Sequence, residues 1–338
     1  MKKKNSGIEL QFHWIFIMIA GAFILAFFIS IASRQRATQQ DKLEMQAATE
    51  IDTLFTGASG SKGAFQQIPA PKTSISFECT TSCSCSFSVG KKQTQYGERN
   101  IFSVSKGETT DLSLWTIPWD FGIRGGNFLI ISNSKTRLIL VYDPSDQTSK
   151  DLLADATKTL PPELVTGIIT PDKIRQLQPV EESTVRVVFL GVPARNLLRD
   201  LSFSSPKDTT AVFVGADNTL LFYSYDGTRW VASTNTYVTT MERYAAMFST
   251  SAMYSCTMQK AYERLKFITI VYINRLPHIA SSKCSYSQSR ALLEEFLELV
   301  KKIGKGNSEV RPSELTVVLK KIETENAQLQ VASCPLLY

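Results

Sequence analysis

The first pattern along the chain is an uncharged apolar run from Trp14 to Ala32. The run has nineteen residues, and at 1.5 Å per residue it spans about 28 Å, close to the hydrocarbon thickness of a bilayer. A buried core helix and a cleaved secretory signal are the alternatives, but the run is apolar on every side and is longer than the usual signal core. The sequence therefore predicts a transmembrane helix over residues 14–32, after a short basic tail over residues 1–13.

The next segment, residues 33–56, keeps the periodicity of a helix. Four apolar residues are expected on one face of it: Leu43, Ala47, Ile51 and Leu54. This spacing predicts a helical stalk that continues the membrane segment as one helix of about 40 residues. Residues 57–72 are rich in glycine, serine and proline, so they are expected to be a linker. A chain without residues 1–56 is then expected to be soluble and monomeric.

Residues 73–338 are expected to form one soluble domain that begins with a β-rich part over residues 73–140. Apolar and polar residues alternate in two short segments there: Ile75 to Cys79 and Cys85 to Val89. Such alternation predicts half-buried strands, and the short Thr/Ser-rich segment between them predicts a turn. Cys79 and Cys85 are therefore expected to lie near each other on neighbouring strands.

The rest of the domain changes from strands to helices. Apolar, β-branched runs at 137–142, 185–190 and 210–214 are separated by helix-like segments, which predicts a βαβ-like part over residues 137–232 with a partly parallel sheet. A hairpin is expected over residues 220–231, turning at Asp226-Gly227. Residues 240–330 are expected to be helical, with helices over 240–275, 287–303 and 313–330, the first ending before Pro277. The predicted fold class is α/β, with α+β as the alternative.

Composition and charge exclude one class of partner. Hydrophobic residues make up 43% of the chain and charged residues 20%, which is enough to build a core. The net charge is +6, and Lys2, Lys3 and Lys4 supply half of it. The remainder is too dilute for a nucleic-acid surface. The positive-inside rule favours a cytoplasmic N-terminus by about one charge.

Cysteine usage supports the same orientation. The chain has six cysteines, and three of them, Cys79, Cys83 and Cys85, crowd into one Thr/Ser-rich segment. Thiols in such a segment are expected to form disulfides in an oxidising compartment, with a metal cluster and free thiols as alternatives. A further bridge is expected within the set Cys256, Cys284 and Cys334, and the connectivity stays open. The domain is therefore expected outside the cytoplasm, at the cell surface.

Most catalytic chemistry lacks its residues in this sequence. The two histidines, His13 and His278, are expected at the membrane boundary and in a loop, and no Gly-x-Ser-x-Gly elbow is present. Phosphate loops and zinc patterns are missing as well, so no enzyme activity, cofactor or metal is expected. Asp143, Asp217 and Asp226 follow strands, where they either serve a carboxylate-dependent hydrolase or begin turns.

An aromatic segment is the candidate contact surface. Pro118 to Gly126 combines proline, glycines and aromatic residues, which predicts an exposed loop. Trp115, Trp119 and Phe121 are the residues expected to contact a protein or glycan partner. Core packing is the alternative for these side chains.

The N-terminus carries a resemblance over about 55 residues. Lys4-Asn-Ser-Gly7 followed by Ile8-Glu-Leu-Gln and a long apolar helix looks like the basic leader of type IV pilin-like proteins, although Glu9 lies closer to Gly7 than in the usual pattern. The same segment also resembles uncharacterised single-pass archaeal membrane proteins, a resemblance that implies no activity. The predicted function is a membrane-anchored, extracytoplasmic protein with a binding or assembly role. A pilin-like subunit and a membrane-tethered hydrolase are the alternatives.

Overall fold

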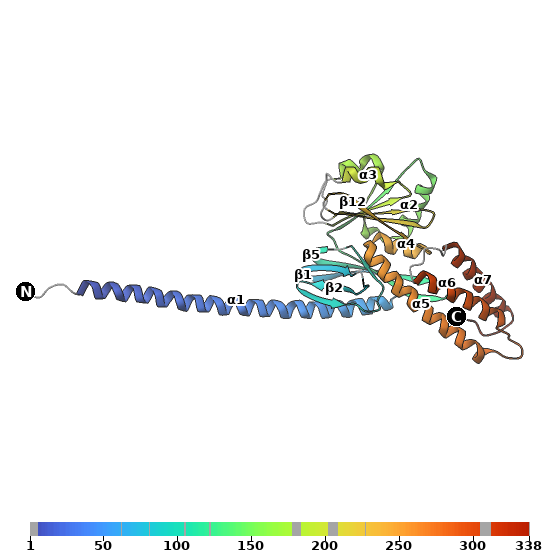
Figure 1. The fold of residues 1–338 in the computed structure, drawn as a ribbon, viewed down its shortest axis with the longest axis horizontal. Coiled ribbons are helices and arrows are strands. Elements are labelled where there is room, and N and C mark those ends of the chain that lie inside the picture. The colour runs from blue at the N-terminus through green and yellow to red at the C-terminus, as the bar shows by residue number, and fades with distance from the viewer. Residues whose placement is uncertain are drawn as a thin grey trace, which may run out of the picture.

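One long helix gives the protein its shape. In the computed structural model, which describes residues 6–61, 63–80, 82–104, 106–121, 123–177, 184–201, 209–226, 228–304 and 312–337, helix α1 runs without a break over Ser6–Gly60, 55 residues. It is about 80 Å long. Its N-terminal part protrudes from a compact head, and its C-terminal part lies along the head (Figure 1). The prediction that membrane segment and stalk form one helix is confirmed, and the helix is longer than expected.

The apolar part of α1 makes no contact with the head. From Trp14 to Ile31 its large hydrophobic side chains are exposed. Among the described residues, α1 is the one helix that is long and apolar enough to cross a membrane. The structure thus supports a membrane-spanning segment at the predicted place.

The first sheet, sheet A, is built on the C-terminal part of α1. Its six strands lie in the order β3-β2-β1-β5-β6-β4, with bounds Lys92–Gln95, Cys85–Val89, Phe65–Cys79, Lys106–Asp120, Arg124–Ser132 and Ile101–Ser103. All neighbouring pairs are antiparallel except β4 and β6, which are parallel. Ala47, Ile51 and Phe55 of α1 are buried against one face of this sheet, and the Phe55 and Phe87 rings lie edge to face at 5.3 Å.

Two predictions about this region are wrong in detail. Leu43 and Leu54, expected on the packed face of the stalk, are 67% and 41% exposed. The buried face of α1, which includes Glu44, is centred about a quarter of a turn around the helix from these two leucines. Half of the expected linker, residues 65–72, is strand. β1 already begins at Phe65, and its pairing with β5 shifts register between Pro69 and Thr73. Proline has no backbone N–H, so it fits a strand at such an irregularity.

The second sheet, sheet B, is partly parallel, as predicted. Its strands lie in the order β12-β11-β10-β9-β7-β8, with bounds Trp230–Thr236, Thr219–Tyr225, Thr209–Val214, Thr184–Leu190, Thr136–Tyr142 and Val165–Ile169. Strands β8, β7, β9 and β10 are parallel. Strands β10, β11 and β12 are antiparallel, which confirms the predicted hairpin, although Gly227 of its turn lies outside the described residues. Strand β8 was missed by the sequence analysis.

Helices cover both faces of sheet B. The helix α3 (Ala194–Leu201) and the short 3₁₀ helix Pro171–Gln176 pack on one face. The helices α2 (Gln147–Thr159) and α4 (Thr240–Met247) lie on the other, where they join the large core cluster. Helix α4 is therefore placed between the two sheets (Figure 1), and its Tyr244 ring lies 6.1 Å from that of Trp115 in sheet A.

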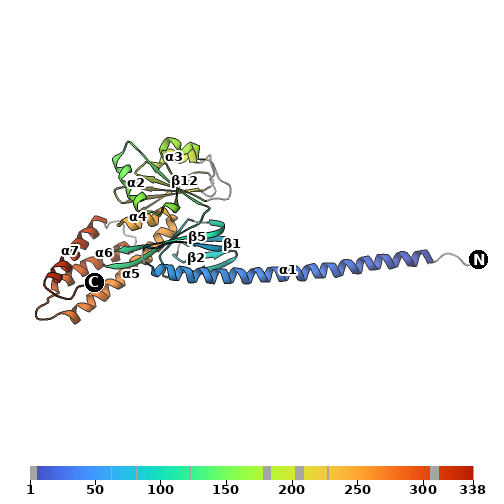
Figure 2. The same cartoon turned by 180° about the vertical axis from the view of Figure 1, so that it is seen from behind.

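The C-terminal part is helical, with one break that was not predicted. Residues 240–275 form two helices, α4 and α5 (Ser251–Ile279), because Thr250 caps a new helix by accepting a hydrogen bond from the Met253 amide. Helix α5 also runs past Pro277, since Leu276 in the same turn is buried in the core. Helices α6 (Ser287–Gly304) and α7 (Pro312–Val331) follow as expected. Figure 2 shows these helices on the side of the head that faces away from the free end of α1.

Candidate functional site

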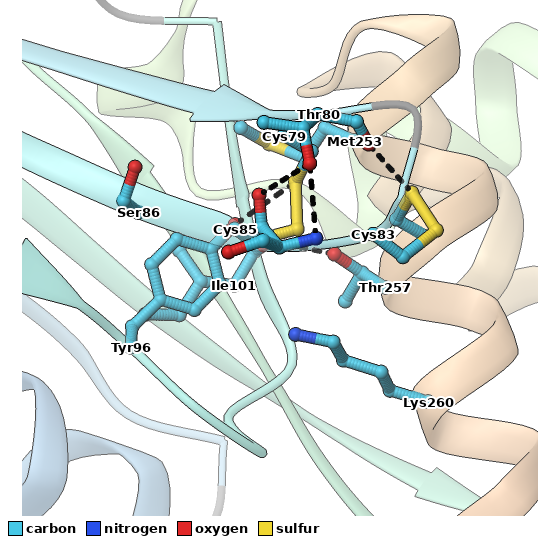
Figure 3. Close-up of a disulfide and its surroundings, with 12 residues drawn as sticks. Cys79, Thr80, Cys83, Cys85, Ser86, Tyr96, Ile101, Met253, Thr257 and Lys260 are labelled. Atoms are coloured by element: carbon cyan, nitrogen blue, oxygen red, sulfur yellow. Dashed lines mark hydrogen bonds between the residues drawn. A yellow bond between two sulfur atoms is a disulfide. The ribbon is translucent and has the colours of Figure 1, made fainter.

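All six cysteines form disulfides, and two of these lie side by side. Cys79 pairs with Cys85 across the β1–β2 register, which confirms that the two residues lie near each other on neighbouring strands. Cys83, in the turn between these strands, pairs with Cys256 of α5, which is 173 residues away in the chain. Cys284 pairs with Cys334. The hairpin turn is thus fastened to the helical part (Figure 3). Three disulfides fit an oxidising, extracytoplasmic compartment.

Other contacts around these disulfides join sheet A to α5. Lys260 donates a hydrogen bond to the Gly97 carbonyl at 3.0 Å and lies 5.9 Å from the centre of the Tyr96 ring. Burial raises the pKa of the Tyr96 hydroxyl, so this ring stays neutral. Within the part of the chain that the structure describes, no group of three or more His, Cys, Asp or Glu side chains could hold a metal ion. The Lys260 contacts add to the disulfides in holding sheet A against α5.

The predicted aromatic contact loop is instead part of the core. Strand β5 continues through Trp119, and β6 begins at Arg124, so the connection is a tight hairpin. Trp119 is 0% exposed, and Trp115 and Phe121 are buried as well. The prediction is wrong because the two strands of the hairpin accommodate Pro118 in β5 and Gly125 and Gly126 in β6. The Trp119 ring fits over Gly125, where an added Cβ would come within 2.4 Å of it.

A buried carboxylate stands at the centre of this aromatic group. Glu242 of α4 accepts hydrogen bonds from the Trp119 indole at 3.0 Å, the Tyr262 hydroxyl at 2.8 Å and the Val238 amide at 2.8 Å. Burial raises the pKa of the Glu242 carboxyl, and the three donors oppose this rise. The group is closed off from solvent, so it holds sheet A, α4 and α5 together and offers no site for a substrate.

A buried arginine plays the same part for sheet B. Arg186 of β9 donates hydrogen bonds to the carbonyl oxygens of Met247 at 3.0 Å, Ala246 at 2.9 Å and Ser249 at 2.7 Å. These carbonyls end α4, where a positive charge is favourable. Burial lowers the pKa of Arg186 to about 9, so it stays charged at neutral pH. This contact explains why α4 ends where the sequence predicted a continuous helix.

The three aspartates that follow strands each serve a turn. Asp143 accepts hydrogen bonds from Ser145, and Asp217 from the Thr219 amide. Asp226 accepts from the amides of Thr228 and Arg229, and these bonds lower its pKa to about 2. The turn interpretation is the one that the structure supports.

The histidines do not join these aspartates. His278 is exposed in the last turn of α5. The side chain of His13 lies outside the described residues. The aspartates and His278 therefore give no geometric support to a hydrolase.

The remaining candidate is a groove between the stalk and sheet A, which we call the stalk groove. It has a volume of about 600 Å³ and runs beside α1 from Arg36 to Glu50, with Lys72 and Thr73 of β1 on its other side. At 1.5 Å per residue it begins about 6 Å beyond Ala32, the end of the apolar run, and ends about 27 Å beyond it. The groove therefore lies at the membrane-facing side of the head.

Two polar contacts fix the stalk beside this groove. Glu44 accepts a hydrogen bond from the Lys91 amide at 2.9 Å, and its carboxylate fits against Gly90, where an added Cβ would lie 2.3 Å from its Cδ. Further along the helix, Arg99 forms an ion pair with Asp52 and donates to the Asp52 carbonyl at 3.0 Å. These contacts and the packed face of α1 attach the stalk to the head.

Comparison of the chain with protein-family models, curated proteins and solved structures finds no match. The stalk groove is therefore judged on its own chemistry. Cations line it at Arg36 and Lys72, amides at Gln39 and Gln46, and an exposed aliphatic side chain at Leu43. Such a lining suits a polar helix or peptide better than a small apolar ligand. The sequence does not predict the groove, because its spacing places Leu43 on the packed face of the stalk.

Proposed function

We propose that this protein is a single-pass membrane protein whose extracytoplasmic head acts in binding or assembly, with its N-terminus in the cytoplasm. The observation that carries the proposal is the division of α1. Its apolar part is bare, whereas its C-terminal part contributes Ala47, Ile51 and Phe55 to the core of the head. A bare apolar helix is stable in lipid and costly in water. Three disulfides in the head favour the outer side of the membrane.

The proposed topology is tested by thiol labelling of intact cells. Because every native cysteine is in a disulfide, an introduced thiol is the only reactive one. Val331 is 88% exposed on the head, so Val331→Cys should react with a membrane-impermeant maleimide in intact cells. Lys3→Cys should react only after permeabilisation. The reverse pattern would place the head in the cytoplasm and refute the proposal.

A second candidate is a type IV pilin-like subunit. The observation in its favour is again the division of α1. The N-terminal half of this helix is bare, and its C-terminal half packs on a largely antiparallel sheet. Processing after Gly7 would be part of this function. N-terminal sequencing of the mature protein separates the candidates: a chain that begins at Ile8 supports the pilin-like subunit, and an intact basic tail supports the permanent anchor.

A further inference from the structure

The wall that α1 gives to the stalk groove includes one line of side chains along the helix. The outer members of that wall are Arg36, Gln39, Leu43, Gln46 and Glu50, while Gln40, Glu44 and Ala47 line the groove on the side of α1 nearer the head. The outer members are separated by alternating steps of three and four residues, the spacing at which one helix presents a seam to another. The same steps continue back through the apolar run, at Ala32, Ile29, Leu25, Ala22 and Met18. One seam therefore runs from the membrane segment into the groove.

The head does not cover this seam. Leu43 lies in the middle of the groove and is 67% exposed, because the head packs on the neighbouring face that carries Ala48, Ile51 and Phe55. Within the membrane segment, Leu25 and Ile29 of the seam are exposed as well. A helix laid along the seam would bury the Leu43 side chain, and removing this apolar surface from water would stabilise the pair.

We propose that this partner is a second copy of the chain, with α1 paired in parallel to α1 along the seam and the stalk of each copy seated in the groove of the other. The inference rests on the proposed membrane anchor. A bilayer holds all copies in one direction and at one depth, so that equal residues stand at equal height. In this arrangement Leu43 meets its counterpart and leaves water.

The polar members of the seam suit a pair of identical helices. An amide both donates and accepts, so Gln39 and Gln46 can each form hydrogen bonds with their own counterparts. Polar residues at such positions fix the register of paired helices at some cost in stability. Ala22 and Ala32 let the helices approach closely in the membrane segment.

The charges of the groove are complementary between two copies. Lys72 stands on the head side of the groove, and Glu50 belongs to the α1 side. A second stalk laid in the groove brings another Glu50 carboxylate beside Lys72. Arg36 lies one turn beyond the apolar run, where its long side chain can turn to lipid phosphates and avoid its counterpart.

Disulfide cross-linking of the full-length protein in membranes tests the pairing. At an interaxial distance of about 8–9 Å, two Cα atoms on the seam lie within about 7 Å, which a disulfide can bridge. Met45 is also largely exposed, at 59% against 67% for Leu43. It lies about 200° around the helix from Leu43, so the two Met45 Cα atoms of a pair would be about 13 Å apart. Leu43→Cys should therefore form a covalent dimer under mild oxidation, and the matched control Met45→Cys should not.

Three outcomes would overturn the proposal. Equal cross-linking of the two variants would show random collision, and a monomeric Leu43→Cys variant at rising protein-to-lipid ratio would show that the seam is unpaired. A cross-linked product of another mass, found in native membranes and lost on reconstitution, would assign the groove to a different protein. In each of these three cases, a protein that resists extraction by carbonate would still support the proposed membrane anchor. Release of the protein by carbonate would refute the anchor and the pairing together.

Discussion

The burial of Trp119 leads to a quantitative prediction for one substitution. The Trp119 ring stacks on Phe128 at 5.2 Å, meets Phe121 and Tyr262 edge to face at 4.9 and 5.3 Å, and donates its indole N–H to Glu242. Trp119→Ala would therefore remove both a large part of the core and one of the donors that satisfy a buried carboxylate.

The two losses can be estimated separately. The cavity left by a buried tryptophan costs about 3–5 kcal/mol. A buried acceptor that loses its donor costs about 1–3 kcal/mol more. Trp119→Phe keeps a six-membered ring but removes the pyrrole part of the indole with its N–H. It should therefore lower the free energy of unfolding by roughly the second amount, plus a packing loss smaller than that of the alanine variant. The alanine variant should thus be clearly less stable than the phenylalanine variant.

Thermal unfolding of the full-length protein in detergent, followed by near-ultraviolet circular dichroism, measures these effects. Trp230 is the matched control: it is half-buried on the edge strand β12, with its ring 5.7 Å from that of Tyr225. Trp230→Ala should therefore cost much less than Trp119→Ala. A loss below about 1 kcal/mol for Trp119→Ala would refute the core assignment and restore the segment as a contact surface.

Three further predictions follow from the same structure. A fragment of residues 36–338 should be soluble and folded. The shorter fragment 57–338, which the sequence suggested, should aggregate because it loses the α1 turns that pack in the core. Gel filtration distinguishes a soluble fragment from an aggregated one. Replacing Cys83 and Cys256 by serine should lower the free energy of unfolding by about 5 kcal/mol in the chain-entropy estimate, because their disulfide closes a loop of 173 residues. Replacing Cys79 and Cys85, whose disulfide closes a loop of 6 residues, should cost about 2 kcal/mol. Equal losses in urea unfolding would contradict this reason. Burial raises the pKa of the Glu242 carboxyl in the folded protein, so on raising the pH the unfolded chain loses this proton at a lower pH than the folded protein does. The free energy of unfolding should therefore fall as the pH rises above about 4.3, the pKa of an unperturbed glutamate. Glu242→Gln should flatten that slope above about pH 4.3, and an unchanged slope would show that another group causes it.

The sequence by itself determined the features that depend on local pattern. A long uncharged run specified the apolar part of α1, and alternation of apolar and polar residues specified β1 and β2 with Cys79 opposite Cys85. The β-branched runs specified three of the parallel strands of sheet B, β7, β9 and β10. Each of these signals lies within about twenty residues, the range over which periodicity reports on one element.

Only the tertiary structure decided which surfaces are covered. Leu43 and Ala47 share one helical face by spacing, but sheet A covers only Ala47, and so the groove was not visible in the sequence. Trp119 looked exposed because its neighbours include proline and glycine, and it is buried because α4 and α5 bring Glu242 and Tyr262 to it. These partners lie more than 100 residues away, where chain periodicity carries no information, and burial is a property of the packed elements together.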